Sequence, residues 1–241
     1  MRIVTVPCRS DNYAYLVICE KTNLAAVVDP SLAEPVLAAL EAEGVSVAAI
    51  WNTHHHFDHV EGNAAIAKKY SGCEIVGYET DRDRIPGQTR LVSDGDVLEV
   101  GEQVCAEVIF NPGHTSGAIS YYVKNPGVVF TGDTLFAAGC GRLFEGSAEQ
   151  MHTSLQRLAK LPRETQVYCG HEYTKSNLRF CLAVEPENVA IQERSDHVHR
   201  LREQAKSTMG FTIAEELATN VFVRASADEF ADLRNRKDRF Q

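Results

Sequence analysis

The heptapeptide THHHFDH has the residue types and the spacing of a metal site, and it follows a short apolar run. Alternate side chains of an extended chain point to the same side, so His54, His56 and Asp58 are expected to converge. His55 then faces away, and His59 can serve a neighbouring position. Imidazole and carboxylate groups suit zinc, and also iron or manganese. Four histidines and an aspartate within six residues therefore indicate a metal site rather than a polar loop.

Three further potential ligands each follow a predicted strand, namely His114, Asp133 and His171. Strand ends are where α/β folds assemble their sites, although Asp133 taken alone could equally cap a turn. With the first cluster they supply five imidazoles and two carboxylates. A catalytic zinc takes three protein ligands, so seven ligands indicate two metals that share a bridging carboxylate and a bridging water. The other histidines, expected to support ligands or to lie on the surface, are His55, His152, His197 and His199.

The elements that must position these ligands change in character along the chain. Periodicity predicts strands over 2–8, 13–20, 25–28, 47–51, 74–78, 97–100, 104–110, 118–123, 128–131 and 166–169, and helices over 33–42, 61–70 and 147–161. Beyond the last ligand it predicts helices over 173–184, 189–207 and 225–239, and no strand. We therefore predict an α/β catalytic domain over 1–172 and a helical domain over 173–241.

Composition restricts the classes of partner. The chain has 241 residues, 44% of them hydrophobic, which is enough for a globular core. A net charge of −9 offers no broad basic face to a nucleic acid, and no apolar run is long enough for a membrane. The start MRIVTVPCRSDNY lacks the apolar region of a signal peptide, and the seven cysteines include no C-x-x-C pair. We expect a cytoplasmic monomer with reduced thiols that acts on a small molecule.

The ligand pattern and the strings around it resemble the metallo-β-lactamase superfamily and, within it, the glyoxalase II (hydroxyacylglutathione hydrolase) family. The strings that carry this resemblance, which spans nearly the whole chain, are Asp11-Asn12-Tyr13, Pro112-Gly113-His114-Thr115, Gly132-Asp133-Thr134-Leu135-Phe136, Gly139-Cys140-Gly141-Arg142, Gly170-His171-Glu172-Tyr173-Thr174 and Arg234-x-Arg236-Lys237-Asp238. The resemblance implies an αββα sandwich of two mixed sheets, followed by a C-terminal helical domain that binds the substrate.

The same resemblance implies two divalent metal ions per chain, with zinc favoured over iron or manganese. Together with the spacing it assigns His54, His56 and His114 to one metal. It assigns Asp58, His59 and His171 to the other, with Asp133 as the bridge. The implied reaction is hydrolysis of S-D-lactoylglutathione and related 2-hydroxyacylglutathiones by a hydroxide that bridges the two metals. Asp58 is expected to orient this hydroxide as well as to bind metal.

The implied substrate contacts are Arg142, Phe144, Tyr173, Arg234 and Lys237. Glutathione carries two carboxylates, so a specific site needs fixed cations. Arg234 and Lys237 are three residues apart and hence on one helix face. Some family members carry Lys-x-Tyr where this chain has Arg142-Leu143-Phe144, so a phenol contact is lost at Phe144.

Other activities remain open at this point. They are another hydrolase of the superfamily (a lactonase, a lactamase, another thioesterase or a tRNA-processing nuclease), a mono-iron persulfide dioxygenase, and a metal-stabilised binding protein. The acidic charge disfavours the nuclease. A mono-iron enzyme needs only three protein ligands, so the presence of Asp58, His59 and His171 disfavours the dioxygenase. A structural zinc site is a closed set of four ligands, which seven ligands at strand ends do not match.

Overall fold

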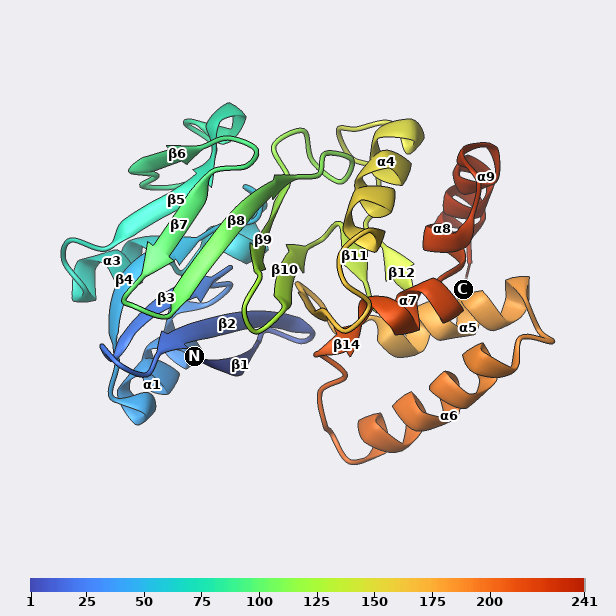
Figure 1. Ribbon diagram of the computed structural model, residues 1–241, viewed down its shortest axis with the longest axis horizontal. Coiled ribbons are helices and arrows are strands. Elements are labelled where there is room, and N and C mark those ends of the chain that lie inside the picture. The colour runs from blue at the N-terminus through green and yellow to red at the C-terminus, as the bar shows by residue number, and fades with distance from the viewer. Residues whose placement is uncertain (241) are drawn as a thin grey trace. The chain divides into compact units, whose positions relative to one another are not determined.

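The computed structural model describes residues 1–240 (Figure 1). The chain divides into two compact units. Unit 1 comprises Met1–Phe110 and Gly117–Pro126, and unit 2 comprises Asn111–Ser116 and Gly127–Gln241. The predicted boundary between a catalytic and a helical domain near residue 172 stays a prediction.

Unit 1 is built on a mixed six-stranded sheet. Its strands, in spatial order, are β1 (Arg2–Cys8), β2 (Asn12–Cys19), β3 (Leu24–Val28), β4 (Ser46–Trp51), β5 (Glu74–Tyr78) and β6 (Arg90–Val92). The first three strands pair antiparallel, and the pairs from β3 to β6 are parallel. Val28 pairs with Trp51, so β3 and β4 end at the same edge of the sheet. The residues that follow these two strands are therefore brought together at that edge.

Two helices pack against one face of this sheet. They are α1 (Ala33–Glu43) and α3 (Asn63–Lys69), and their Val36, Leu40 and Ile66 join Leu16 and Ile18 in one buried cluster. Helix α1 ends at Gly44, whose φ of +64° is the left-handed conformation that glycine adopts most readily. The predicted helix over 61–70 is shorter in the structure and is preceded by a separate turn, α2 (Phe57–Val60).

Three more strands of unit 1 form an antiparallel meander. They are β7 (Val97–Val100), β8 (Val104–Phe110) and β9 (Ile119–Val123). A short 3-10 helix, η1 (Glu79–Asp81), follows β5.

Unit 2 places its strands beside a group of helices. Strand β10 (Val128–Gly132) pairs parallel with β13 (Gln166–Cys169), which pairs antiparallel with β14 (Phe211–Thr212). A small hairpin consists of β11 (Leu135–Phe136) and β12 (Gly139–Cys140). Helix α4 (Ala148–Ala159) begins with a capping box of Ser147 and Gln150 and has Met151, Leu155 and Leu158 among its buried residues, as the amphipathic pattern predicts.

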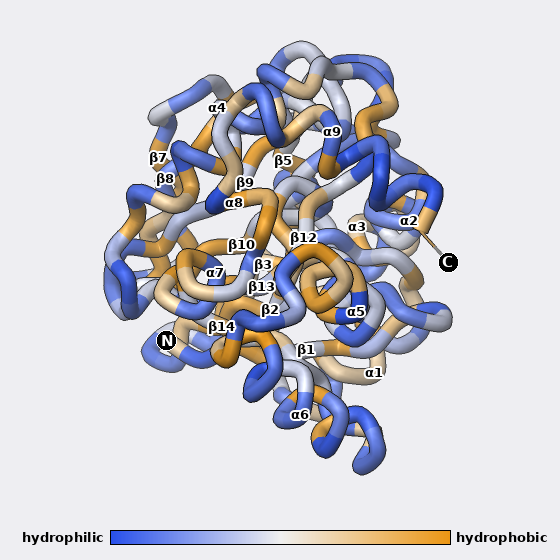
Figure 2. Tube along the Cα trace, turned by 90° about the vertical axis from the view of Figure 1, so that its right-hand side faces the viewer, coloured by the Kyte–Doolittle hydropathy of each residue, from blue (hydrophilic) through white to orange (hydrophobic). Residues whose placement is uncertain are grey.

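The C-terminal part of unit 2 is mainly helical, in agreement with the sequence. Its helices are α5 (Thr174–Val184), α6 (Val189–Glu203), α7 (Ile213–Thr219), α8 (Val221–Arg224) and α9 (Ala227–Asp238). Figure 2 shows that α6 is largely hydrophilic. The expectation of no strand beyond residue 172 is wrong, because β14 lies there. This strand is only two residues long and is defined by its pairing with β13. Two residues are too few to show the alternating pattern by which strands are predicted.

Within residues 1–240, no helix has both the length and the apolar character needed to cross a bilayer. All seven cysteines lie in this range and are free thiols.

Candidate active site

The predicted ligands of unit 1 lie on the segment that leaves β4 and enters α2. His54 and His59 are both 1% exposed. The Nε2 atom of His54 lies 3.1 Å from Nδ1 of His56, and Nε2 of His59 lies 3.8 Å from Oδ2 of Asp58. The rings of His54 and His59 have their centroids 4.2 Å apart, so the structure brings together the four ligands that the heptapeptide predicts for this segment.

A buried carboxylate that the sequence analysis did not identify holds this segment in place. Asp29 follows β3 with a φ of +47°, and it is 2% exposed. Its Oδ1 accepts a hydrogen bond from the backbone N–H of Thr53 (2.8 Å), and its Oδ2 accepts one from the Thr53 hydroxyl (2.6 Å). The same Oδ2 lies 2.9 Å from Nδ1 of His59. Asp29 thus fixes the ligand segment at two points.

This network determines which ring nitrogens are available for a metal. A carboxylate only accepts hydrogen bonds, so His59 must carry its proton on Nδ1, and its Nε2 presents a lone pair. The Thr53 hydroxyl donates its hydrogen to Asp29, so its oxygen accepts a hydrogen bond from Nδ1 of His54 at 3.0 Å. Nε2 of His54 then also carries a lone pair. One buried aspartate therefore sets both imidazoles in the tautomer that binds metal through Nε2.

Asp58 is held by a residue of β2. The amide of Asn12 donates to Oδ2 of Asp58 at 3.0 Å and to its backbone oxygen at 3.1 Å. The carboxylate is thereby oriented at the start of α2, although the Asp58 side chain is 39% exposed. A fixed and partly exposed carboxylate of this kind suits both metal binding and the orientation of a water molecule.

The predicted ligands of unit 2 meet around one carboxylate. Oδ2 of Asp133 lies 3.4 Å from Nε2 of His114 and 3.4 Å from Nε2 of His171. The parallel pairing of Gly132 with Cys169 explains part of this arrangement, because it brings the ends of β10 and β13 to one edge. The Asp133 carboxylate therefore lies beside one ring nitrogen from each of two predicted ligands.

The backbone of the loop that follows β12 fixes the imidazole of His114. Nδ1 of His114 lies 2.9 Å from the carbonyl oxygen of Arg142, so Nδ1 carries the proton and Nε2 presents the lone pair. Gly141 makes this approach possible. A Cβ atom at that position would lie 1.9 Å from the backbone oxygen of Asp133 and 3.0 Å from Nδ1 of His114.

Aromatic side chains surround the unit 2 ligands. The ring of Tyr173 stacks on His171 with centroids 4.7 Å apart, and Phe136 meets Tyr173 edge-on at 5.4 Å. Phe144 meets His114 edge-on at 5.2 Å and is 63% exposed. Two of the predicted substrate contacts, Phe144 and Tyr173, therefore lie beside metal-ligand candidates. Phe136 belongs to the same group and was not predicted.

The predicted cations differ in exposure. The Arg142 side chain is 69% exposed, with Nε 4.0 Å from Oδ1 of Asp238. Arg234 is buried and donates to the carbonyl oxygen of Cys140 at 2.9 Å and to Oδ1 of Asp238 at 2.8 Å. Arg234 therefore fixes the loop that carries Arg142.

The ammonium group of Lys237 donates to the backbone oxygen of Ser176 at 3.1 Å and lies over the rings of Phe180 and Phe240. Burial, together with the positive charge of Arg234, lowers the pKa of Lys237 to about 8. This lysine is therefore a cation at neutral pH that loses its charge under mildly alkaline conditions.

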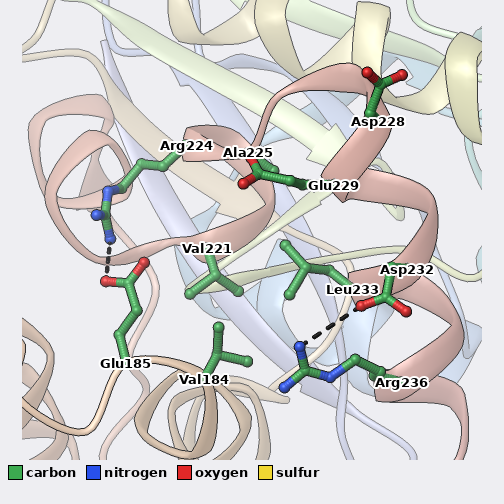
Figure 3. A pocket seen from close by; sticks show the side chains of 10 residues that line it. All are labelled: Val184, Glu185, Val221, Arg224, Ala225, Asp228, Glu229, Asp232, Leu233 and Arg236. Atoms are coloured by element: carbon green, nitrogen blue, oxygen red, sulfur yellow. Dashed lines mark hydrogen bonds and ion pairs between the residues drawn. The ribbon is translucent and has the colours of Figure 1, made fainter.

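A cavity of about 610 Å³ lies elsewhere in unit 2, between the end of α5 and helices α8 and α9 (Figure 3). Two ion pairs span its wall, Arg224 with Glu185 at 2.6 Å and Arg236 with Asp232 at 3.6 Å. None of the predicted site residues lines it. Because these charged groups pair with each other, the cavity is not a candidate for the anion-binding function that the sequence predicts.

Comparisons with known proteins cover nearly the whole chain. Residues 10–171 match the metallo-beta-lactamase superfamily, and residues 172–240 match the hydroxyacylglutathione hydrolase C-terminus. A hydroxyacylglutathione hydrolase of Synechococcus sp. is 49% identical over 259 residues and is covered in full, as is this chain. One from Methylococcus capsulatus is 44% identical, with all of this chain and 99% of the relative covered.

Solved structures of the same fold are also similar to this chain. ETHE1 from Myxococcus xanthus has a TM-score of 0.75 and 29% identity, covering 98% of this chain and 90% of its own. A di-iron-bound form of TTHA1623 has a TM-score of 0.59 and 28% identity, covering 71% and 92%. These findings confirm the predicted fold of two mixed sheets with a C-terminal helical region. The histidine and aspartate clusters are consistent with a binuclear metal site.

Proposed function

Since the chain belongs to the hydroxyacylglutathione hydrolases of the metallo-beta-lactamase superfamily, we propose that it hydrolyses S-D-lactoylglutathione and related 2-hydroxyacylglutathiones to the free hydroxy acid and glutathione. The observation that carries this proposal is the 44–49% identity to hydroxyacylglutathione hydrolases over the full length of the chain. The likeness thus covers the metal-ligand candidates as well as the helical region.

The donor set fits two divalent metal ions. We assign His54, His56 and His114 to one metal, and Asp58, His59 and His171 to the other, with Asp133 shared. The tautomers of three of these histidines support metal binding, because Asp29, Thr53 and the Arg142 carbonyl leave a lone pair on Nε2 of His59, His54 and His114. The equal 3.4 Å distances from Asp133 to His114 and His171 support its role as the bridge.

Imidazole and carboxylate donors accept zinc, iron or manganese, and we propose zinc. When bound, two such ions would supply an acidified water as the nucleophile and a Lewis acid for the thioester carbonyl. The chain's own part is to orient the reactants. We assign the orientation of the water to Asp58, and its hydrogen bond from Asn12 supports this role. The leaving group is a thiolate, whose conjugate acid has a pKa of about 8.5, so it needs no strong general acid.

Substrate binding is assigned to residues of unit 2. The exposed guanidinium of Arg142 and the ammonium of Lys237 are the cations for the carboxylates of glutathione. Tyr173 offers a phenol hydroxyl and Phe144 an apolar face. Arg234, whose donors engage Cys140 and Asp238, contributes by holding the Arg142 loop.

We further propose that the protein works as a cytoplasmic monomer on this small-molecule substrate, without nucleic acid or membrane. The seven free thiols and the net charge of −9 support the compartment and the absence of a nucleic-acid partner.

The test is hydrolysis of S-D-lactoylglutathione by protein whose metal content has been measured, with release of glutathione followed by a thiol reagent. We expect turnover in metal-replete protein, loss after treatment with a chelator, and recovery on adding zinc. A lactone and a persulfide serve as comparison substrates. No release of glutathione by metal-replete protein, or one iron per chain together with oxygen-dependent consumption of the persulfide, would contradict the proposal.

A further inference from the structure

We propose that Asp81 and Arg84 are positioning residues that clamp His55 from both sides and thereby fix the backbone of the metal-ligand segment. The clamp lies wholly in unit 1 and contains none of the seven proposed ligands. The inference rests on the proposed function to the extent that this segment binds metal.

Three contacts form a closed ring. Nδ1 of His55 lies 3.2 Å from Oδ2 of Asp81, and Nη2 of Arg84 lies 2.6 Å from Nε2 of His55. Nη1 of Arg84 lies 3.4 Å from the other carboxylate oxygen of Asp81. Each member of the ring therefore contacts the other two.

Donor and acceptor chemistry determines the state of the histidine. A carboxylate can only accept, so Nδ1 of His55 carries the proton, and a guanidinium can only donate, so Nε2 accepts. Both ring nitrogens of His55 are thus engaged. This explains why the middle histidine of the run His54-His55-His56 is an anchor, whereas its two neighbours are ligand candidates.

The clamp is attached to a rigid part of unit 1. Asp81 is fully buried, and its backbone oxygen accepts from the N–H groups of Arg84 (2.9 Å) and Ile85 (3.2 Å). Gly117 lies directly against its carboxylate, since a Cβ atom there would be 2.5 Å away. Asp81 therefore has little freedom to move, and the imidazole that it holds has little freedom either.

Three contacts therefore hold the first part of the ligand segment, in addition to the bonds that hold His59 and Asp58. Asp29 binds Thr53, the backbone oxygen of Thr53 accepts from the N–H of Ile119 at 2.9 Å, and Asp81 binds His55. The first two contacts hold the start of the segment, whereas Asp81 holds it between His54 and His56. Loss of the third contact should let these two imidazoles move apart. The proposed metal would then meet a site that is less well preorganised.

The primary test is Asp81→Asn, with Asp83→Asn as the matched control. If the NH₂ group of the asparagine faces Arg84, two donors meet. If it faces Nδ1 of His55, that nitrogen must accept, so the proton of the imidazole moves to Nε2 and faces the donors of Arg84. The ring of contacts is broken in both cases. Asp83 is exposed on the same turn with a φ of +70°, which asparagine tolerates. The control therefore makes the same chemical change two residues away.

The measurement is zinc affinity by competition with a chromophoric chelator, expressed per folded chain. We expect Asp81→Asn to weaken zinc binding by about 10- to 100-fold, the effect of losing a group that orients ligands, and Asp83→Asn to leave it within about twofold of wild type. The absorption spectrum of the cobalt-substituted protein should change in Asp81→Asn alone. A purely structural role would lower the thermal midpoint of the apo-protein without changing either readout, and that result would overturn the proposal.

A milder variant keeps the test decisive if Asp81→Asn does not fold. Arg84 is 36% exposed, and Arg84→Met removes one side of the clamp but keeps the bond between Asp81 and His55. We expect about a threefold to tenfold loss of zinc affinity, and an unchanged affinity would overturn the proposal. The wild-type titration separates the two hypotheses. A wild-type chain that binds no zinc refutes the proposed metal site, whereas a wild type that binds and variants that bind equally well refute only the clamp.

Discussion

Replacing Asp29 with asparagine should disturb both proposed metals at once, although Asp29 is assigned to neither. The amide has nearly the shape of the carboxylate, but one oxygen becomes an NH₂ group. If that group faces the Thr53 hydroxyl (2.6 Å) and Nδ1 of His59 (2.9 Å), it meets two donors. If the amide turns over, the NH₂ group instead faces the backbone N–H of Thr53 at 2.8 Å.

The favoured response is a change of tautomer. His59 would accept from the amide at Nδ1 and carry its proton on Nε2, the atom that should bind metal. The Thr53 hydroxyl would turn toward His54 and impose the same change there. Each imidazole would then have to give up a proton before it binds.

The expected loss of zinc affinity and stability follows from these changes in hydrogen bonding. Removing a group that orients ligands typically weakens metal binding by about 10- to 100-fold, or about 1.4–2.7 kcal/mol. Two charge-assisted hydrogen bonds also become neutral ones, each weaker by about 1 kcal/mol, which should lower the free energy of unfolding by about 2 kcal/mol. We therefore expect two weakened sites in a less stable protein.

The assay is a zinc titration of apo-protein that resolves two binding steps, and Thr53→Val is its companion. The valine removes the hydroxyl beside His54 but leaves the bond between Asp29 and His59 intact. We expect Asp29→Asn to weaken both steps and Thr53→Val to weaken only one. Two unaltered steps in Asp29→Asn would refute the tautomer argument, and so would equal weakening of both steps in Thr53→Val.

The remaining predictions concern substrate binding. Lys237 has a pKa near 8 because of burial, so its charge is present below that pH and lost above it; the KM should rise as pH increases through 8, and Lys237→Met should abolish that rise with little change in kcat. Arg234→Ala should raise the KM more than it lowers kcat, and denaturant titration should show an unfolding free energy about 2 kcal/mol lower, since a charged bond to the Cys140 carbonyl is lost. Phe144→Tyr restores a phenol at the loop and should lower the KM by about threefold at unchanged kcat, because one hydrogen bond contributes about 0.5–1.5 kcal/mol; a KM equal to wild type would remove residue 144 from the glutathione contacts.

The ligand candidates were accessible to sequence reasoning because they follow predicted strands. The pattern around His54 is dense, and each later candidate follows an apolar run within one to four residues. Alternation and helical periodicity also located most of the long elements, since these signals extend over several residues. Strand β14 was not predicted, because a strand of two residues is too short to show an alternating pattern.

The residues that support the ligands were not found from the sequence. Asp29 precedes Pro30 and reads as an ordinary turn, and only the pairing of Val28 with Trp51 brings it beside Thr53. Asp81 lies in a charged run, TDRDR, that reads as exposed, yet it is fully buried. Both roles depend on pairing between segments distant in sequence, which no local pattern encodes. Knowing that two parallel strands are neighbours would have directed attention to the residues that follow both.

Anomalous diffraction from zinc-soaked crystals can show whether the two ligand clusters hold two metal ions bridged by Asp133. We predict two peaks per chain, one contacted by His54, His56 and His114, the other by Asp58, His59 and His171. The Asp133 carboxylate should touch both. A single peak, or two peaks that Asp133 does not join, would contradict this assignment.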